Sequence, residues 1–339
     1  MKTVTLKGPG EFILEDTRTP AAPGPGEVLV RVKHVGICGT DIHAYYGRQP
    51  FFDYPRITGH ELGVIIEELG EGVEGLTVGQ HCSVEAYLSR PGDKAFSRGK
   101  TNCTSTTQCL GVHADGGMRE RVVLPANKMH PSSLDTEKLA IVEMLCIGHH
   151  AVERSSLVGD ELIAVIGVGP IGLGTVQFAC QPGTKVVAVD ISEDRLANCK
   201  EAFPEIETLQ VTLDDEPLVD LWKTQFDTLP EVVFECTGNK HSMEASIGLP
   251  DFGGRIIMVG FFMGDLVFSD PDFHKRELSI MSSRNATAHN FQDVVDQMEA
   301  GKINPDTWIT HHCKAEEFPG LIDQWLVPEE GLIKGIVEF

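Results

Sequence analysis

The sequence predicts an α/β protein of two domains, a β-rich domain and a doubly wound parallel sheet. Three observations support this fold class. Over roughly the first 130 residues, short alternating segments are broken by Gly and Pro. From about residue 160 onward, compact apolar runs alternate with segments of helical length. The chain has 339 residues, which is long enough for two hydrophobic cores.

The prediction of a β-rich region is based on three segments, EVLVRVKHVGICG, GVIIEELG and MRERVVLPA, at residues 27–39, 63–70 and 118–126. Apolar and polar side chains alternate along them, as expected where one face of each strand is buried. Gly and Pro interrupt the segments often. This pattern is typical of a strongly bent antiparallel sheet or barrel.

The second region contains four apolar runs, ELIAVIG, KVVAVD, EVVFECTG and GRIIMVG, separated by segments of helical length. Strands buried on both faces have near-continuous apolar sequences, and their alternation with helices predicts βαβ units. After LSIMSS, at residues 278–283, the pattern becomes helical and polar. It ends in the strand-like GLIKGIVEF.

Composition and charge exclude several classes of function. The net charge of −22 argues against a nucleic-acid or anionic-membrane partner, because both bind clusters of Lys and Arg. No apolar run approaches the roughly 20 residues needed to cross a bilayer, and the first residues lack signal-peptide features. The nine cysteines are scattered and odd in number, which indicates a reducing compartment. We therefore expect a cytoplasmic protein.

A glycine-rich turn in AVIGVGPIGLG predicts a dinucleotide site. Gly167 makes the tight turn, Gly169 lets the backbone approach a pyrophosphate, and Gly172 allows close packing of helix on strand. The next strand ends in Asp190, whose carboxylate can bind both ribose hydroxyls and repels a 2′-phosphate, so NAD is expected rather than NADP. The predicted cofactor residues are Gly167, Gly169, Pro170, Ile171, Gly172, Asp190, Arg195, Thr237, Gly238, Val259, Gly260 and Arg284.

Three segments, GICGTDIH, GHE and AIVEMLC, carry side chains that can bind a metal. A catalytic zinc takes about three protein ligands and keeps one open position. Cys38, His60 and a carboxylate from Glu61 or Glu143 would satisfy this requirement. Taken singly, each of these residues also fits a packing or surface role. Because 22 positions separate Cys38 from His60, residue types alone do not establish that they converge.

Together these motifs resemble the zinc-containing medium-chain alcohol dehydrogenase superfamily. The similarity covers essentially the whole chain and includes CGTD, GHE, LGVHADGGMRE, VIGVGPIGLG and SSRNAT. RQPFFDYPR and FSDPDFHKRELSIMSSRNAT are most similar to polyol and sugar-acid dehydrogenases of the L-galactonate or L-gulonate 5-dehydrogenase type. The resemblance implies a GroES-like catalytic domain over residues 1–147 and 285–339, interrupted by a Rossmann NAD-binding domain over residues 148–284. It also implies a homodimer or homotetramer.

The resemblance further implies roles for individual residues. The zinc ligands are matched by Cys38, His60, Glu61 and Glu143. Whether Glu61 or Glu143 binds zinc directly or through water stays open. Asp41 matches the residue that orients His60, while Thr40 and His43 match a relay that carries a proton to solvent. The implied reaction transfers a hydride from a secondary alcohol of a sugar acid or polyol to NAD. An L-threonine or sorbitol-type dehydrogenase and a non-catalytic NAD-binding regulatory protein are the alternatives.

The chain departs from the family pattern in two places. Relatives with a structural zinc carry four closely spaced cysteines where this chain has EAYLSRPGDKAFSRGKTNC. Cys103 and Cys109 together would supply only two of the four ligands that a tetrahedral structural zinc requires. We therefore expect one catalytic zinc per chain, no structural zinc, and an ordinary turn at residues 91–93. Met144 replaces the usual proline after Glu143, which weakens the assignment of Glu143 as a direct ligand.

A sugar-acid substrate also requires a cation for its carboxylate. The candidates are Arg48, Arg56, Arg119 and Arg284. The aromatic side chains that could shape the pocket are Tyr45, Tyr46, Phe51 and Phe52. Each of these residues fits a surface or packing role equally well.

Overall fold

The computed structural model describes residues 1–50, 52–212 and 217–339. The chain divides into two compact units. Unit 1 comprises Met1–Met144 and Ala286–Phe339, and unit 2 comprises Leu145–Asn285. Among the helices in these described residues, none has both the length and the apolar character needed to cross a membrane.

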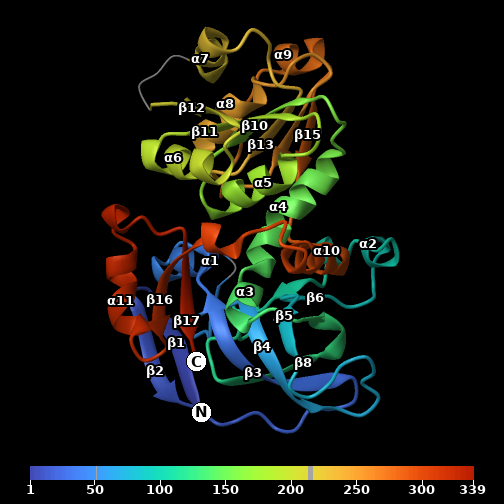
Figure 1. The fold of residues 1–339 in the computed structure, drawn as a ribbon, viewed down its shortest axis with the longest axis vertical. Helices are drawn as coiled ribbons and strands as arrows, with labels where there is room; N and C mark the ends of the chain where they lie inside the picture. The colour runs from blue at the N-terminus through green and yellow to red at the C-terminus, as the bar shows by residue number, and fades with distance from the viewer. Residues whose placement is uncertain (51, 213–216) are drawn as a thin grey trace. The chain divides into compact units, whose positions relative to one another are not determined.

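Unit 1 is rich in β-structure (Figure 1). Its strands are β1 Lys2–Gly8, β2 Glu11–Asp16, β3 Glu27–Gly36, β4 Glu61–Leu69, β5 His81–Val84, β6 Tyr87–Leu88, β7 Gln108–Cys109, β8 Arg121–Pro125, β9 Met129–Ser132, β16 Ile309–Lys314 and β17 Lys334–Glu338. Its helices are α1 Gly39–Tyr45, α2 Lys94–Ser97, α3 Thr136–Ala140, α10 Ala288–Glu299 and α11 Phe318–Trp325, with 3-10 turns η1 Thr101–Cys103, η2 Ala126–Lys128, η3 Pro305–Thr307 and η4 Pro328–Glu330.

The main sheet of unit 1 has the strand order β16-β17-β3-β4-β5-β9, and β8 also pairs with β3. Strand β3 is at its centre, and Val28, Val30 and Val32 of this strand are fully buried in the core. The alternation predicted for residues 27–39 is therefore present. Strand β17, from the end of the chain, pairs antiparallel with β3. This pairing brings the C-terminal segment beside the region that contains the candidate metal residues.

Unit 2 is the predicted doubly wound sheet (Figure 1). Its strands are β10 Leu162–Ile166, β11 Lys185–Asp190, β12 Glu207–Gln210, β13 Val232–Glu235, β14 Arg255–Met258 and β15 Ser279–Ser282. Its helices are α5 Pro170–Ala179, α6 Glu193–Ala202, α7 Leu218–Gln225, α8 Lys240–Ile247 and α9 Asp270–Lys275, and α4 Val142–Ser155 enters it from unit 1.

All neighbouring strands of unit 2 are parallel, in the order β12-β11-β10-β13-β14-β15. This is the order of a Rossmann sheet, and its topological switch point lies between β10 and β13. Every residue of β13 is buried, as expected for a central strand covered on both faces. Ligands of such sheets bind outside the carboxyl ends of the strands, where the predicted cofactor residues occur.

Candidate functional site

Cys38 lies where strand β3 gives way to helix α1. It is the N-cap residue of this helix, and its backbone is extended. Its N–H donates to Oδ2 of Asp41, three residues on, at 3.0 Å. A side chain at the third helical position that accepts from the N-cap amide is half of a capping box. The helix start therefore fixes the backbone that carries the Cys38 thiol.

His60 and Glu61 reach the same place from strand β4. This strand begins at Glu61, two residues earlier than predicted, and Glu61 pairs with Gly36 at the end of β3. One ligand atom from each of Cys38, His60 and Glu61 lies within 4.8 Å of the other two. Strand pairing thus brings together side chains that are far apart in the sequence.

Gly36 leaves the space that Glu61 occupies. A Cβ atom at Gly36 would lie 2.1 Å from Glu61 Oε2 and 3.0 Å from Glu61 Cβ. Real Cβ atoms essentially never approach another heavy atom as closely as 2.1 Å. The carboxylate of Glu61 therefore packs directly against the backbone of β3.

A buried lysine that the sequence motifs do not indicate binds Glu61. Lys334 is the first residue of β17 and is 2% exposed. Its Nζ donates to Glu61 Oε1 at 2.6 Å and to Ile37 O at 2.9 Å. Burial lowers the pKa of Lys334, but its interaction with Glu61 outweighs burial and raises the pKa overall. The one sequence feature that could have indicated this ion pair is a lysine inside the apolar final strand.

Glu143, the second predicted carboxylate, is outside the three-residue cluster. It lies near the start of α4, is buried, and its Oε1 accepts a hydrogen bond from the Tyr87 hydroxyl. Burial raises the pKa of Glu143, and the charge of His60 opposes this shift. Glu61 is therefore the carboxylate that the geometry brings beside Cys38 and His60. Tyr87 is not among the residues predicted from the sequence.

Asp41 lies beside His60 without a hydrogen bond. The distance from His60 Nδ1 to Asp41 Oδ1 is 4.0 Å, longer than a hydrogen bond, and neither atom has a partner among the described residues. The orienting bond implied by the resemblance is not formed in this structure. Burial alone would lower the pKa of His60, but Cys38, Cys109 and Asp41 raise it well above its ordinary value.

The predicted proton-relay residues share helix α1. Thr40 is half-buried and His43 is exposed. Residues three apart lie on the same face of a helix. The pair extends from the partly buried start of the helix toward solvent.

In unit 2, the glycine-rich turn joins β10 to α5. Gly167 has a φ of +83°, and a Cβ atom there would lie 2.6 Å from Thr237 Cγ2. A Cβ atom at Gly172 would lie 1.8 Å from Gly167 O, so helix and turn are in direct contact. Gly169 is the N-cap of α5, and Pro170 follows at the first helical position. The amides at this helix start suit an anionic pyrophosphate.

The turns after β13 and β14 contain the next predicted cofactor residues. Thr237 and Gly238 follow β13, and Val259 and Gly260 follow β14. A Cβ atom at Gly260 would lie 2.2 Å from Gly238 N, so the two turns touch. Glu235, fully buried and not selected from the sequence, joins them. Its carboxylate accepts from the Thr237 hydroxyl, and its carbonyl accepts from the Gly260 amide at 2.8 Å.

Asp190 ends strand β11 and is buried. Its Oδ2 accepts from Val168 N at 2.8 Å and its Oδ1 accepts from Ser192 N at 2.9 Å. Each carboxylate oxygen has a further lone pair and can still accept a hydrogen bond from a ribose. Arg195 is exposed on α6, and its Nη1 lies 3.8 Å from where a Cβ atom of Gly169 would be. A carboxylate and a guanidinium therefore lie beside this turn.

Known proteins match both halves of the chain. Residues 24–134 match the alcohol dehydrogenase GroES-like domain, and residues 170–300 match the zinc-binding dehydrogenase family. L-galactonate-5-dehydrogenase of Escherichia coli strain K12 is 37% identical over 100% of this chain and 99% of its own length. The chain belongs to the zinc-containing alcohol dehydrogenase family. The predicted superfamily and fold class are thereby confirmed.

Two solved structures share the fold of this dehydrogenase along its whole length. A short chain alcohol dehydrogenase (RspB) from Escherichia coli CFT073, complexed with NADH, has a TM-score of 0.92 and 28% identity, covering 100% of this chain and 99% of that one. A zinc-binding dehydrogenase from Sinorhizobium meliloti 1021, bound to NADP, has a TM-score of 0.88 and 26% identity with the same coverage. Both cofactors therefore occur among the neighbours.

The donor set of this dehydrogenase fits a zinc ion. Thiolate, imidazole and carboxylate are the ligand types that zinc takes from proteins. Glu61 Oε2 and His60 Nδ1 are buried without a hydrogen-bond partner among the described residues. Unpartnered buried polar atoms cost free energy, which a bound ligand or a relaxed neighbour recovers.

Asp93 makes the main hydrogen bonds in the segment for which no structural zinc is expected. One of its oxygens caps helix α2, and the other accepts from Ser105 N at 2.7 Å and from Ser105 Oγ at 2.8 Å. Cys103 is exposed. Burial raises the pKa of Cys109 to about 12, and this thiol also interacts electrostatically with His60. Cys109 is therefore coupled electrostatically to one residue of the metal cluster.

The predicted carboxylate-binding arginines have different surroundings. Arg48 lies over the Tyr46 ring at 5.1 Å, and Arg56 pairs with Asp115 at 3.3 Å. Arg119 is half-buried, its Nε has no partner among the described residues, and burial lowers its pKa.

The remaining predicted substrate-site residues are Arg284 and the aromatic side chains. Arg284 is exposed in unit 2. Tyr45 and Phe52 are buried in the core of unit 1, whereas Tyr46 is exposed. Phe51 lies outside the described residues.

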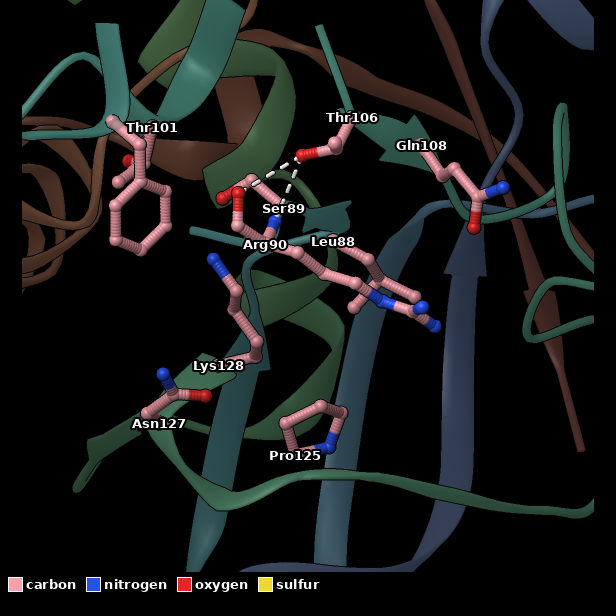
Figure 2. Close-up of a pocket in the computed structure, with 10 residues that line it drawn as sticks. Leu88, Ser89, Arg90, Thr101, Thr106, Gln108, Pro125, Asn127 and Lys128 are labelled. Carbon is pink, nitrogen blue, oxygen red and sulfur yellow. Dashed lines mark hydrogen bonds between the residues drawn. The ribbon is translucent and has the colours of Figure 1, made fainter. Parts of the chain in front are cut away.

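A cavity of about 560 Å³ in unit 1 is lined by none of the predicted site residues. Figure 2 shows it with Arg90, whose backbone N–H donates to Thr106 Oγ1 at 3.0 Å. Lys128 also lines this cavity, and its Nζ donates to the buried carboxylate of Glu85. This second buried lysine–glutamate pair involves none of the metal-cluster residues.

Proposed function

We propose that this dehydrogenase oxidises a secondary alcohol of a sugar acid or polyol with NAD, with L-galactonate or L-gulonate as the preferred substrate type. The reaction converts the alcohol and NAD⁺ into a ketone, NADH and a proton. The convergence of Cys38, His60 and Glu61 within 4.8 Å is the observation that carries the proposal. The 37% identity to an L-galactonate-5-dehydrogenase supports the substrate class.

Cys38, His60 and Glu61 would hold one zinc ion per chain, with Glu143 as a further carboxylate nearby. When bound, zinc supplies a Lewis acid for the substrate hydroxyl, and NAD supplies the hydride acceptor. The half-buried Thr40 hydroxyl takes the substrate proton. His43, exposed on the same helix face, passes this proton to solvent.

Asp190 favours NAD over NADP in this proposal. Its carboxylate is held by two backbone amides, so it can bind ribose hydroxyls without moving. A fixed negative charge at the end of β11 repels a 2′-phosphate. Arg195 acts in the opposite direction, because a guanidinium beside the glycine-rich turn attracts a 2′-phosphate.

Arg119 is the arginine that we propose for the substrate carboxylate. The Arg48 guanidinium lies over the Tyr46 ring and Arg56 pairs with the Asp115 carboxylate. Arg119 Nη2 donates to the Asp115 carbonyl at 3.5 Å, and its Nε has no partner among the described residues. A half-buried guanidinium whose Nε is unsatisfied gains charge-assisted hydrogen bonds when it binds a carboxylate. Arg119→Met should raise KM for an aldonate and leave KM for an uncharged polyol unchanged. An equal change for both substrates would exclude this role.

The central experiment follows NADH formation with a panel of aldonates, polyols and L-threonine, together with the zinc content of the chain. We expect turnover with an aldonate and about one zinc per chain. Cys38→Ser should abolish both, and Cys103→Ser, at an exposed cysteine outside the cluster, is the matched control. Unchanged turnover in Cys38→Ser would show that the zinc mechanism is wrong. Preferred turnover of sorbitol or threonine would move the substrate assignment to those alcohols.

Assembly and location also belong to this proposal. We propose a cytoplasmic homodimer or homotetramer, on the strength of the family resemblance. Sedimentation velocity of the purified chain tests the assembly, and a monomer at micromolar concentration would contradict it.

A further inference from the structure

The buried lysine–glutamate pair beside the metal cluster is built from two strands of unit 1. Lys334 Nζ lies 2.6 Å from Glu61 Oε1, and the two side chains are 2% and 1% exposed. A second bond, from Nζ to Ile37 O at 2.9 Å, ties the lysine to the residue before Cys38. The ammonium is therefore attached to both chain segments that carry the predicted ligands.

This ammonium has opposite effects on the metal-free and the metal-loaded site. A buried carboxylate has a large desolvation cost, and in the metal-free protein Lys334 compensates the charge of Glu61. A divalent ion bound by Glu61 would lie close to the same ammonium, and like charges repel. Lys334 therefore stabilises the protein without metal and opposes the binding of metal.

The pair also makes the two oxygens of Glu61 unequal. Lys334 holds Oε1, whereas Oε2 has no hydrogen-bond partner among the described residues. The backbone of β3 lies close to Oε2, because a Cβ atom at Gly36 would be 2.1 Å from it. Lys334 competes with a metal for Oε1, whereas no hydrogen-bond donor among the described residues competes for Oε2, so the pair favours Oε2 as the metal-binding oxygen.

We propose that Lys334 is a positioning residue that holds Glu61 by Oε1, leaves Oε2 as a single-oxygen metal ligand, and sets how tightly the metal is bound. This inference rests on the proposed zinc site. Removal of the ammonium frees the carboxylate to bind through both oxygens and removes a repelling charge. Metal affinity then rises and the coordination of the metal changes.

Three variants test the proposal. Lys334→Met removes the charge, and Lys334→Arg keeps it. Lys128→Met is the matched control, because Lys128 forms a buried pair with Glu85 beside the cavity in Figure 2 and touches none of the cluster residues. Zinc affinity is measured by competition with a chromophoric chelator. The absorption spectrum of the cobalt-substituted protein reports coordination, and neither measurement depends on turnover.

We expect Lys334→Met to lower the Kd for zinc roughly tenfold or more and to shift the cobalt absorption bands. The rise in Tm on adding zinc should also exceed that of the wild type. Lys128→Met should lower Tm with and without zinc and leave affinity and spectrum unchanged, and Lys334→Arg should stay near the wild type. If Lys334→Met does not accumulate in folded form, Lys334→Gln replaces it in the same measurements.

The outcomes separate the two proposals. If Lys334→Met binds zinc no more tightly than Lys128→Met does, and its cobalt spectrum is unchanged, the proposed role of Lys334 is wrong. A wild-type chain that binds no zinc refutes the proposed function instead.

Discussion

Gly36→Ala should displace Glu61 from the metal cluster. The new Cβ atom would lie 2.1 Å from Glu61 Oε2, and ordinary contact begins at 3.4 Å, so the carboxylate must move by about 1.3 Å. Lys334 holds the other oxygen, which restricts that movement. Overpacking of this kind costs about 1–3 kcal/mol of unfolding free energy. A displacement of about 1 Å at a reacting centre costs roughly 100-fold in kcat/KM.

A double-mutant cycle with Glu61→Ala tests this reasoning. Urea unfolding gives the free energy of unfolding for the wild type, the two single variants and the double variant. We expect Gly36→Ala to cost much less stability once the Glu61 carboxylate is gone. Gly8→Ala is the control, because a Cβ atom at Gly8 meets nothing within 4 Å. An equal cost of Gly36→Ala in both backgrounds would refute the proposed clash.

Three further predictions concern unit 2 and the Asp93 segment. Asp190→Ser should improve kcat/KM for NADP relative to NAD by roughly tenfold or more, because it removes a charge that repels the 2′-phosphate. Arg255→Met should lower the free energy of unfolding by about 2 kcal/mol at pH 7. It removes the hydrogen bonds from Arg255 Nη1 and Nη2 to the Glu161 carboxylate, at 2.7 and 2.9 Å. Burial raises the pKa of Glu161, but its bonds to Arg255 and to Val158 N lower it overall. In urea titrations the stability difference between variant and wild type should therefore shrink as pH falls below 4.5 and Glu161 is protonated. The bonds from Arg255 to the Ser155 and Ser156 carbonyls account for the difference that remains. Asp93→Ala should speed hydrogen exchange at the Ser105 amide, measured by mass spectrometry, and unchanged exchange would contradict the joining role of Asp93.

The local sequence predicted the elements of this protein well, for a physical reason. Burial on both faces makes a strand apolar throughout, so the runs that became β10, β11, β13 and β14 are visible without tertiary information. The glycine positions are equally local. Gly167 must adopt a positive φ, and Gly172 must lie against Gly167 O, in any helix start of this kind.

The composition of the metal cluster was predicted only in part. Cys38, His60 and a carboxylate were expected to meet, but the choice between Glu61 and Glu143 was open. Strand β4 begins at Glu61, in register with Gly36, and this register directs the Glu61 carboxylate into the cluster. A shift of one residue would turn the side chain to the opposite face, and the partner strand β3 meets β4 only in the folded chain.

The sequence by itself determined the alternation of strands and helices, the dinucleotide turn and the family. The tertiary structure alone decided which groups face one another: Lys334 on Glu61, Tyr87 on Glu143, and Asp41 4.0 Å from His60. Secondary structure follows from residues a few positions apart, so it can be read along the chain. The partner of a buried charge is fixed by strand register and by the cost of leaving that charge unpaired. Both depend on segments that meet only when the chain folds.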